Sequence, residues 1–270
     1  MNSTRISTIK AIALSAACLS TVYLSALAGS LTLASTADAQ YGLGLPSSAR
    51  SGGATRGSGE KNFSLVPEDG AKTLASRPTF YWYISSSNPE ATNTTTVPKI
   101  GDGKNPFRVS FALRDSDGTS VFRADGQAVQ PGLYKFTLPE TAPDLVKGKV
   151  QSWKITLDMP DSTESYLIKA SIRRDEDPVV SKLIGTAKND LEKARIYAKN
   201  AYWYDAIDAY TSWLSQNPKD ELAIIERKEL LNSGLKNNLV FSKEPCKLTE
   251  LIKKLDESKN ATPILLEPRK

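Results

Sequence analysis

Histidine is absent from this sequence of 270 residues. Histidine is the commonest general base and the commonest protein ligand for metal ions, so its absence excludes Ser-His-Asp and Cys-His catalysis. Cysteine is nearly absent, and the two thiols, Cys18 and Cys246, are too few for a four-cysteine zinc site. We therefore expect no catalytic residues, no metal and no cofactor.

A strong charge imbalance is also missing. The formal net charge is +5, no run of five basic residues occurs, and acidic residues interleave with lysine in the C-terminal half. A nucleic-acid-binding domain carries a dense basic stripe, so nothing here indicates a nucleic-acid partner. Hydrophobic residues make up 40% of the chain, which is enough to form a packed core.

Residues 1–39 are predicted to be an export signal peptide. A weakly basic start precedes the apolar stretch Ala11–Leu33, and Ala37-Asp38-Ala39 has the small-x-small pattern of a cleavage site. An uncleaved membrane anchor is the alternative, because the apolar stretch is long enough to span a bilayer. Cleavage after Ala39 would leave a mature chain with no membrane span.

Cleavage would also leave Cys246 as the one remaining thiol, because Cys18 lies in the leader. Cys18 resembles a lipoprotein attachment site only loosely. Residues 40–61, rich in glycine and serine, are predicted to form a flexible linker.

The most apolar stretch outside the leader is Arg77–Ser85, which reads RPTFYWYIS. In a β-strand, successive side chains point to opposite faces, so Phe80 and Trp82 would share one face and Tyr81 and Tyr83 the other. We predict that Phe80 and Trp82 lie in the core. Tyr81 and Tyr83 have two interpretations: they bind a sugar by stacking, or they pack against the C-terminal helices.

Short runs with period-two alternation recur between residues 62 and 174 and are separated by turn residues. Asp115-Ser116-Asp117-Gly118 is interpreted as a hairpin turn, because a calcium loop would need further ligands and a closing glutamate. Trp153 is predicted to lie in the core. Polar or small residues point outward in two of the runs: Arg108, Ser110, Ala112, Arg114, Ser152, Lys154 and Thr156. Six or seven such strands predict an antiparallel β-sandwich of the immunoglobulin-like type.

Between residues 178 and 240, apolar residues recur at three- and four-residue steps, which predicts a small helical domain. Three aromatic residues of its first two helices are predicted to be core residues: Tyr197, Trp203 and Tyr210. A third helix, lined by Leu222, Ile225, Leu230 and Leu231, is predicted to end at Ser233-Gly234. Residues 241–270 are predicted to form a short helix and a loose tail.

The first two helices resemble a single tetratricopeptide repeat. Counting back from Pro218, five residues match positions of that repeat: Ala194, Tyr197, Trp203, Ala206 and Tyr210. One repeat cannot form a concave peptide-binding groove, which needs about three repeats. We therefore expect this helical part to dock onto the sandwich, giving an α+β protein.

The order of these parts is similar to that of a cyanobacterial exported family known as domain of unknown function 928. The most specific pieces are PTFYWY and YAKNAYWYDAI, and the resemblance runs from Ser64 to Leu239. It implies an exported protein of the periplasm or cell envelope, or a secreted one. It implies no activity and no site residues.

Three functions remain open. The first is a non-catalytic exported protein that contacts another envelope protein or its own copies. The second is a carbohydrate-binding module that binds cell-wall polysaccharide through Tyr81 and Tyr83, which requires that pair to be exposed. The third is a glycosidase that uses two carboxylates. The carboxylate pairs considered are Asp115/Asp117, Glu140/Asp144 and Glu176/Asp177.

Overall fold

The computed structural model describes residues 41–45, 63–84, 106–130, 132–158, 165–238, 241, 245–257 and 261–269. The predicted leader and most of the predicted linker lie outside these residues. The described residues form ten strands in two sheets, and five helices, which confirms the α+β class.

The smaller sheet has the strand order β1-β3-β6-β9 and the larger one the order β10-β5-β4-β7-β8-β2. The strands of the smaller sheet are β1 (Phe63–Ser64), β3 (Thr79–Ile84), β6 (Gly132–Thr137) and β9 (Thr262–Pro263). Those of the larger sheet are β10 (Leu266–Pro268), β5 (Ser120–Ala128), β4 (Phe107–Arg114), β7 (Val150–Asp158), β8 (Ser165–Arg174) and β2 (Ala71–Thr73). The helices are α1 (Pro178–Thr186), α2 (Asp190–Lys199), α3 (Trp203–Gln216), α4 (Glu221–Leu235) and α6 (Pro245–Glu257).

The two sheets face each other across aromatic side chains. The ring centroid of Phe80 on β3 lies 5.0 Å from that of Phe111 on β4 and 5.2 Å from that of Trp153 on β7. Most strand pairs are antiparallel, but β2 pairs with β8 and β6 pairs with β9 in parallel. The expectation of a purely antiparallel sandwich was therefore wrong at two sheet edges. Long connections make these parallel pairs possible, because β2 and β8 are far apart in the chain.

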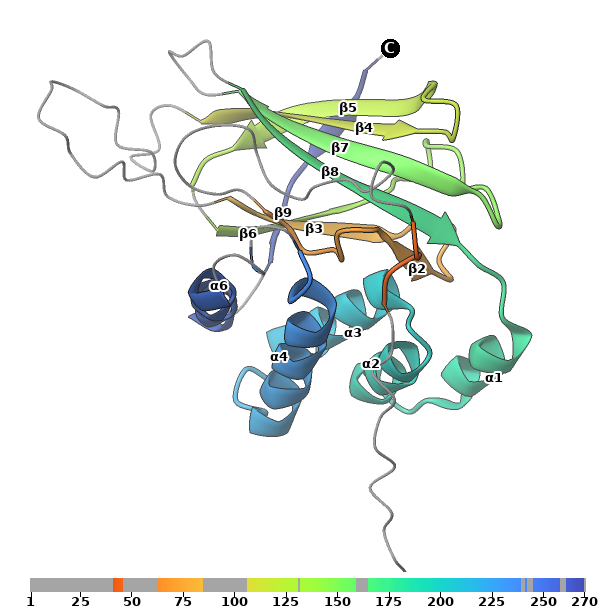
Figure 1. Cartoon of the computed structure of the whole chain (residues 1–270), viewed down its shortest axis with the longest axis vertical. Helices are drawn as coiled ribbons and strands as arrows, with labels where there is room; N and C mark the ends of the chain where they lie inside the picture. The colour runs from red at the N-terminus through yellow and green to blue at the C-terminus, as the bar shows by residue number, and fades with distance from the viewer. Residues whose placement is uncertain are drawn as a thin grey trace, which may run out of the picture. The chain divides into compact units, whose positions relative to one another are not determined.

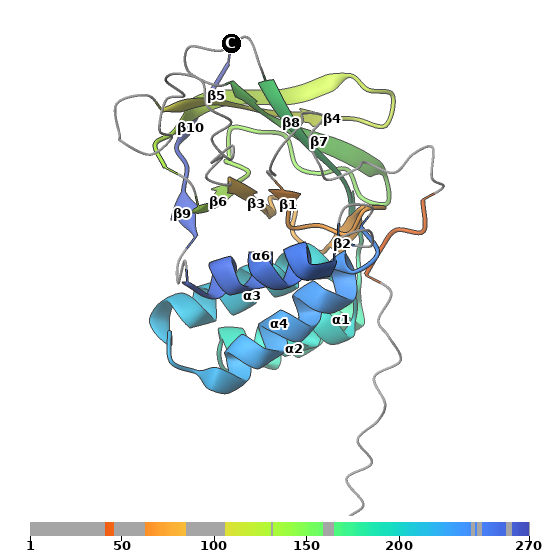
Figure 2. The ribbon, with the colours of Figure 1, turned by 60° about the vertical axis from the view of Figure 1, so that its left-hand side comes forward.

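β3 is buried on both faces, since every residue from Thr79 to Ile84 is buried. One face meets the larger sheet, and the other meets the helices, where the hydroxyl of Tyr81 donates to Asp208 Oδ1 on α3 at 2.6 Å. Figures 1 and 2 show the helices against the smaller sheet, on the side away from the larger one. The smaller sheet is thus a middle layer, which explains why its central strand is aromatic on both sides.

Polar caps set the starts of three helices. Asp177 accepts from the Val180 amide before α1, Asn189 from the Glu192 amide before α2, and Asp220 from the Ala223 amide before α4. Caps of this kind satisfy amides that have no partner inside the helix. Pro178 occupies the first turn of α1, where its missing N–H costs nothing.

Two expectations for α4 were wrong. The helix does not end at Ser233-Gly234 but continues to Leu235. Gly234 is needed for close packing, because a Cβ there would lie 2.1 Å from the ring of Trp203. Leu222 and Ile225 are exposed instead of lining the core.

The C-terminal residues do not form a loose tail, which corrects the prediction for residues 241–270. After α6, β9 pairs with β6 in the smaller sheet and β10 pairs with β5 in the larger sheet. Three side chains of this segment are buried: Ala261, Ile264 and Leu266. The segment therefore joins the edges of the two sheets.

The beginning of the predicted linker is also part of the fold. The ring of Tyr41 packs edge-on against Trp203, with centroids 5.2 Å apart, and the Gly44 amide donates to Asp69 Oδ2 at 2.8 Å. Residues 41–45 are thus held by α3 and the loop before β2, and the rest of the predicted linker lies outside the described residues.

Asp205 ties the loop after β2 to α3. Its carboxylate accepts from the Leu74 amide at 3.0 Å, and the neighbouring Ala75 amide donates to Thr73 Oγ1 at 3.1 Å. Burial raises the pKa of the Asp205 carboxyl from 3.8 to about 6, because desolvation outweighs the hydrogen bonds that the carboxylate accepts.

The free energy of unfolding is expected to rise on acidification from about pH 7 to about pH 5, by on the order of 1 kcal/mol. The folded state holds the Asp205 proton more tightly, so this contribution is full below pH 3.8 and is lost as the pH rises through 6. Urea unfolding at the two pH values measures it. Asp205→Asn should remove the difference, and an unchanged pH dependence in that variant would contradict the assignment.

Candidate functional site

The tyrosine pair does not form an exposed sugar platform. Tyr81 and Tyr83 retain only 2% and 8% of their accessible surface. The Tyr81 hydroxyl donates a hydrogen bond to Asp208 on α3. Tyr83 lies near charged residues of α6, and its pKa is raised mainly by its own burial. A carbohydrate-binding site that uses this pair is excluded, because both faces of β3 are covered.

The predicted core residues are buried or pack against the core. Phe80, Trp82, Trp153 and Trp203 are fully buried, and Tyr210 is buried with its hydroxyl donating to Glu226 Oε2 at 3.2 Å. Tyr197 is half-buried and packs against the core.

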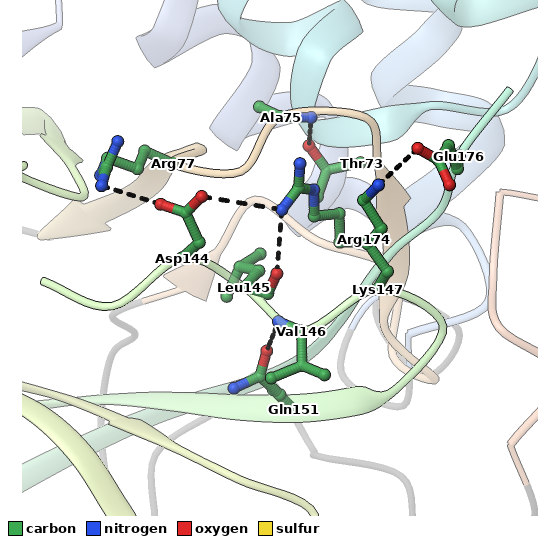
Figure 3. Close-up of polar contacts among 10 residues, drawn as sticks. All are labelled: Thr73, Ala75, Arg77, Asp144, Leu145, Val146, Lys147, Gln151, Arg174 and Glu176. Carbon is green, nitrogen blue, oxygen red and sulfur yellow. Dashed lines mark hydrogen bonds and ion pairs between the residues drawn. The ribbon is translucent and has the colours of Figure 1, made fainter. Parts of the chain in front are cut away.

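The carboxylates considered for glycosidase chemistry have structural partners. Asp144 lies 2.8 Å from Arg77 and 3.9 Å from Arg174, and Glu176 pairs with Lys147 (Figure 3). The hydrogen bond and charge of Lys147 lower the pKa of Glu176. A glycosidase acid needs a raised pKa, so this shift runs against that role.

The remaining carboxylates of those pairs lie in turns or at a helix start. Asp177 caps α1 and accepts from the hydroxyl of Tyr202 at 3.1 Å, and its pKa is lowered mainly by the Val180 amide. Asp117 accepts from the Thr119 amide at 2.8 Å, which lowers its pKa. Asp115 belongs to the same turn as Asp117, and Glu140 is exposed. Asp144 and Glu176, from two of the pairs, lie in one cluster, where each pairs with a basic residue (Figure 3).

The outer face of the larger sheet is turned away from the smaller sheet (Figure 1). The less buried residues of β4 and β7, which alternate with the core residues, lie on this face. On β4, Ala112 lies opposite Arg123 of β5 on one side and Lys154 of β7 on the other. Lys154 in turn lies opposite Lys169 of β8. Directly opposed residues of antiparallel strands are close neighbours on one face, so these three basic side chains form a row across four strands.

This row, which we call the basic row, consists of Arg123, Lys154 and Lys169, with Arg114 beside Lys154. Within the described residues, none of the four forms an ion pair with an acidic side chain. Partial burial lowers the pKa of Lys154, and the charges of Arg114, Arg123 and Lys169 lower it further. The row is therefore a site of uncompensated positive charge.

A hollow of about 110 Å³ lies beside Ala112 on this face. Its lining contains three basic residues, one acidic residue and two hydroxyls: Ser110, Phe111, Ala112, Arg123, Asp125, Lys154, Thr156 and Arg269. Arg269 follows β10 and its Nε lies 2.8 Å from Asp125 Oδ2. The hollow exists because β4 presents the small residues Ser110 and Ala112 between strands that carry long side chains.

A wider groove of about 670 Å³ adjoins the hollow at the edge of the sheet. It shares Asp125 and Arg269 with the hollow and continues along the C-terminal segment to Arg108, Leu265 and Glu267. Its lining mixes charged residues of both signs with apolar ones. The hollow, whose charged residues are mainly basic, is therefore the more specific candidate for binding an anion.

The sequence contained the parts of this site but not their arrangement. Arg114 and Lys154 were predicted to point outward, and the alternation on β4 was correct. Lys154 and Arg123 come to share one row, on either side of Ala112, only because β4 lies between β5 and β7. Strand order cannot be read from alternation. Arg269 was missed because the C-terminal residues were expected to be loose.

Within the described residues, no group of three or more potential ligands could hold a metal ion. In that same part of the chain, no helix is both long and apolar enough to cross a bilayer. The fold and this face define an α+β protein with two facing sheets and a basic outer surface. The chain belongs to the family described as Domain of Unknown Function (DUF928), whose model matches residues 51–244. None of the curated proteins matches the chain.

Proposed function

We propose that this chain is a non-catalytic exported protein of the cell envelope that binds an acidic surface of another protein through the basic row. The observation that carries the proposal is the row itself. Lys154 lies directly opposite Lys169, and Arg123 lies in the same row on the other side of Ala112. None of the three forms an ion pair with an acidic side chain of the described residues. The positive charges on adjacent strands repel one another, and an acidic partner would relieve that repulsion.

A protein partner is favoured over a sugar by the aromatic residues. Sugar-binding faces use exposed aromatic rings, and none of the aromatic side chains that the structure describes is exposed. The face is formed by regular strands, which suits docking against another folded surface. Export is supported by the pattern of the leader, with its small-x-small pattern at Ala37-Asp38-Ala39.

Reversing two charges of the row tests the proposal. Lys154→Glu with Lys169→Glu should weaken binding to immobilised poly-L-glutamate, used as a model acidic protein surface, by at least about tenfold. Binding is measured by surface plasmon resonance at low and moderate salt, because screening should weaken the wild-type interaction as well.

The matched control is Lys182→Glu with Lys188→Glu, which changes the net charge equally at exposed positions on and after α1. This control should bind like the wild type. Equal losses in both double variants would show that only net charge matters and would overturn the proposal. Tighter binding to the polyanionic sugar alginate than to poly-L-glutamate would replace the protein partner with an anionic polysaccharide.

A further inference from the structure

The hollow beside Ala112 combines positive charge with hydroxyl groups. Its role, as inferred here, rests on the proposed function. Two adjoining rows of the sheet meet there. One row places Ser110 of β4 between Asp125 of β5 and Thr156 of β7, and the next places Ala112 between Arg123 and Lys154. Hydroxyl donors thus lie next to cationic groups.

The walls of the hollow are held in position. The Arg269 amide donates to the Arg123 carbonyl at 2.9 Å, and the guanidinium of Arg269 lies against Asp125. The Nε of Arg123 donates to Ser120 Oγ at 3.0 Å, which fixes the stem of that side chain. These contacts restrain both arginines before any ligand binds, which lowers the entropy lost on binding.

The hollow has the chemistry of an oxyanion site. Its lining carries three basic residues against one acidic residue, so it retains net positive charge. Arginine presents a planar fork that matches the two oxygens of a carboxylate, and lysine adds a point charge. A volume of about 110 Å³ admits one such group and not a folded segment of chain.

We propose that this hollow is the anchor subsite of the basic face, and that it seats one carboxylate of the acidic partner protein. Arg123 and Lys154 supply the charge, and the hydroxyls of Ser110 and Thr156 donate hydrogen bonds. The rest of the basic row then attracts neighbouring acidic side chains without fixing them.

Filling the hollow while keeping every charge tests this subsite. Ala112→Leu should reduce affinity for poly-L-glutamate about tenfold. In the wild type, acetate titrated at constant ionic strength should give saturable amide chemical-shift changes around Ala112 and Thr156, and Ala112→Leu should abolish them. The matched control is Ser152→Leu, which adds the same bulk on the same face outside the hollow, and it should leave both results unchanged.

The outcomes separate this inference from the proposed function. Wild-type affinity in a folded Ala112→Leu variant, together with a loss in Lys154→Glu with Lys169→Glu, would overturn the subsite alone. Saturation by inorganic phosphate at one tenth of the acetate concentration would overturn the carboxylate assignment. If Ala112→Leu does not fold, Thr156→Val removes a hydroxyl donor without changing bulk, and unchanged acetate binding in it would contradict the subsite.

Discussion

Trp203→Ala is expected to lower the free energy of unfolding by about 4–8 kcal/mol. Trp203 begins α3 and is fully buried, and replacing a core tryptophan by alanine typically costs about 3–5 kcal/mol. Its indole Nε1 also donates to the Leu65 carbonyl at 2.7 Å, and a buried carbonyl left without a donor costs about 1–3 kcal/mol more.

The effect is large because this one side chain joins several parts of the chain. Its ring packs against Tyr41 in the N-terminal segment and against the backbone of α4 at Gly234. The hydrogen bond to Leu65 ties the same ring to the chain that follows β1. The helices and the sheets therefore share one core, and buried residues of both belong to one hydrophobic cluster.

Urea unfolding followed by circular dichroism measures this loss, and the wild type should unfold in a single transition. Trp213→Ala is the matched control, because Trp213 is half-buried and bonds only locally to Asp220 Oδ2 at 2.8 Å. It should cost clearly less. Two separate transitions, or a Trp203→Ala variant as stable as the Trp213→Ala one, would show that the helical part folds independently of the sandwich.

The sequence predicted which residues share a face but not what covers each face. Alternation separated Phe80 and Trp82 from Tyr81 and Tyr83, because side chains on a strand alternate regardless of context. Whether the tyrosines met solvent or protein depended on where the helices pack, which is a long-range property. In the structure Tyr81 meets protein, because its hydroxyl donates a hydrogen bond to the carboxylate of Asp208 on α3.

The helices were predictable for local reasons, and the exceptions have a tertiary cause. Three- to four-residue spacing is a short-range signal, so the positions of α2 and α3 agree with the sequence pattern. Gly234 looked like a helix terminator, since glycine commonly follows a helix. It lies inside α4 because the ring of Trp203 leaves no room for a side chain.

The edge strands could not be predicted because they are short and contain proline. β9 is Thr262–Pro263 and β10 is Leu266–Pro268, too short to show any alternation. Proline normally argues against a strand, but an edge strand tolerates it because one side of its backbone has no partner to bond. The loose-tail prediction followed from composition and failed for this reason.

A chain that ends at Glu257 is expected to be less stable by about 3–6 kcal/mol and to self-associate. It lacks Ile264 and Leu266, and burying each such side chain contributes about 1.5–3 kcal/mol. It also loses the pairing of β9 with β6 and of β10 with β5. Two further backbone bonds go with it, from the Ile264 amide to the Lys135 carbonyl at 3.0 Å and from the Arg269 amide to the Arg123 carbonyl at 2.9 Å. The edges of β5 and β6 would then be unpaired and open to another chain.

Size-exclusion chromatography and urea unfolding of the truncated chain measure both effects. Leu265→Ser in the full chain is the control, because Leu265 is 84% exposed and its replacement should change neither result. A stable, monomeric truncated chain would show that the C-terminal segment is not needed to close the sheet edges. The truncation also removes Arg269, one wall of the hollow, so a soluble fraction of it should bind poly-L-glutamate more weakly than the full chain. The same segment would then complete both the fold and the proposed binding face.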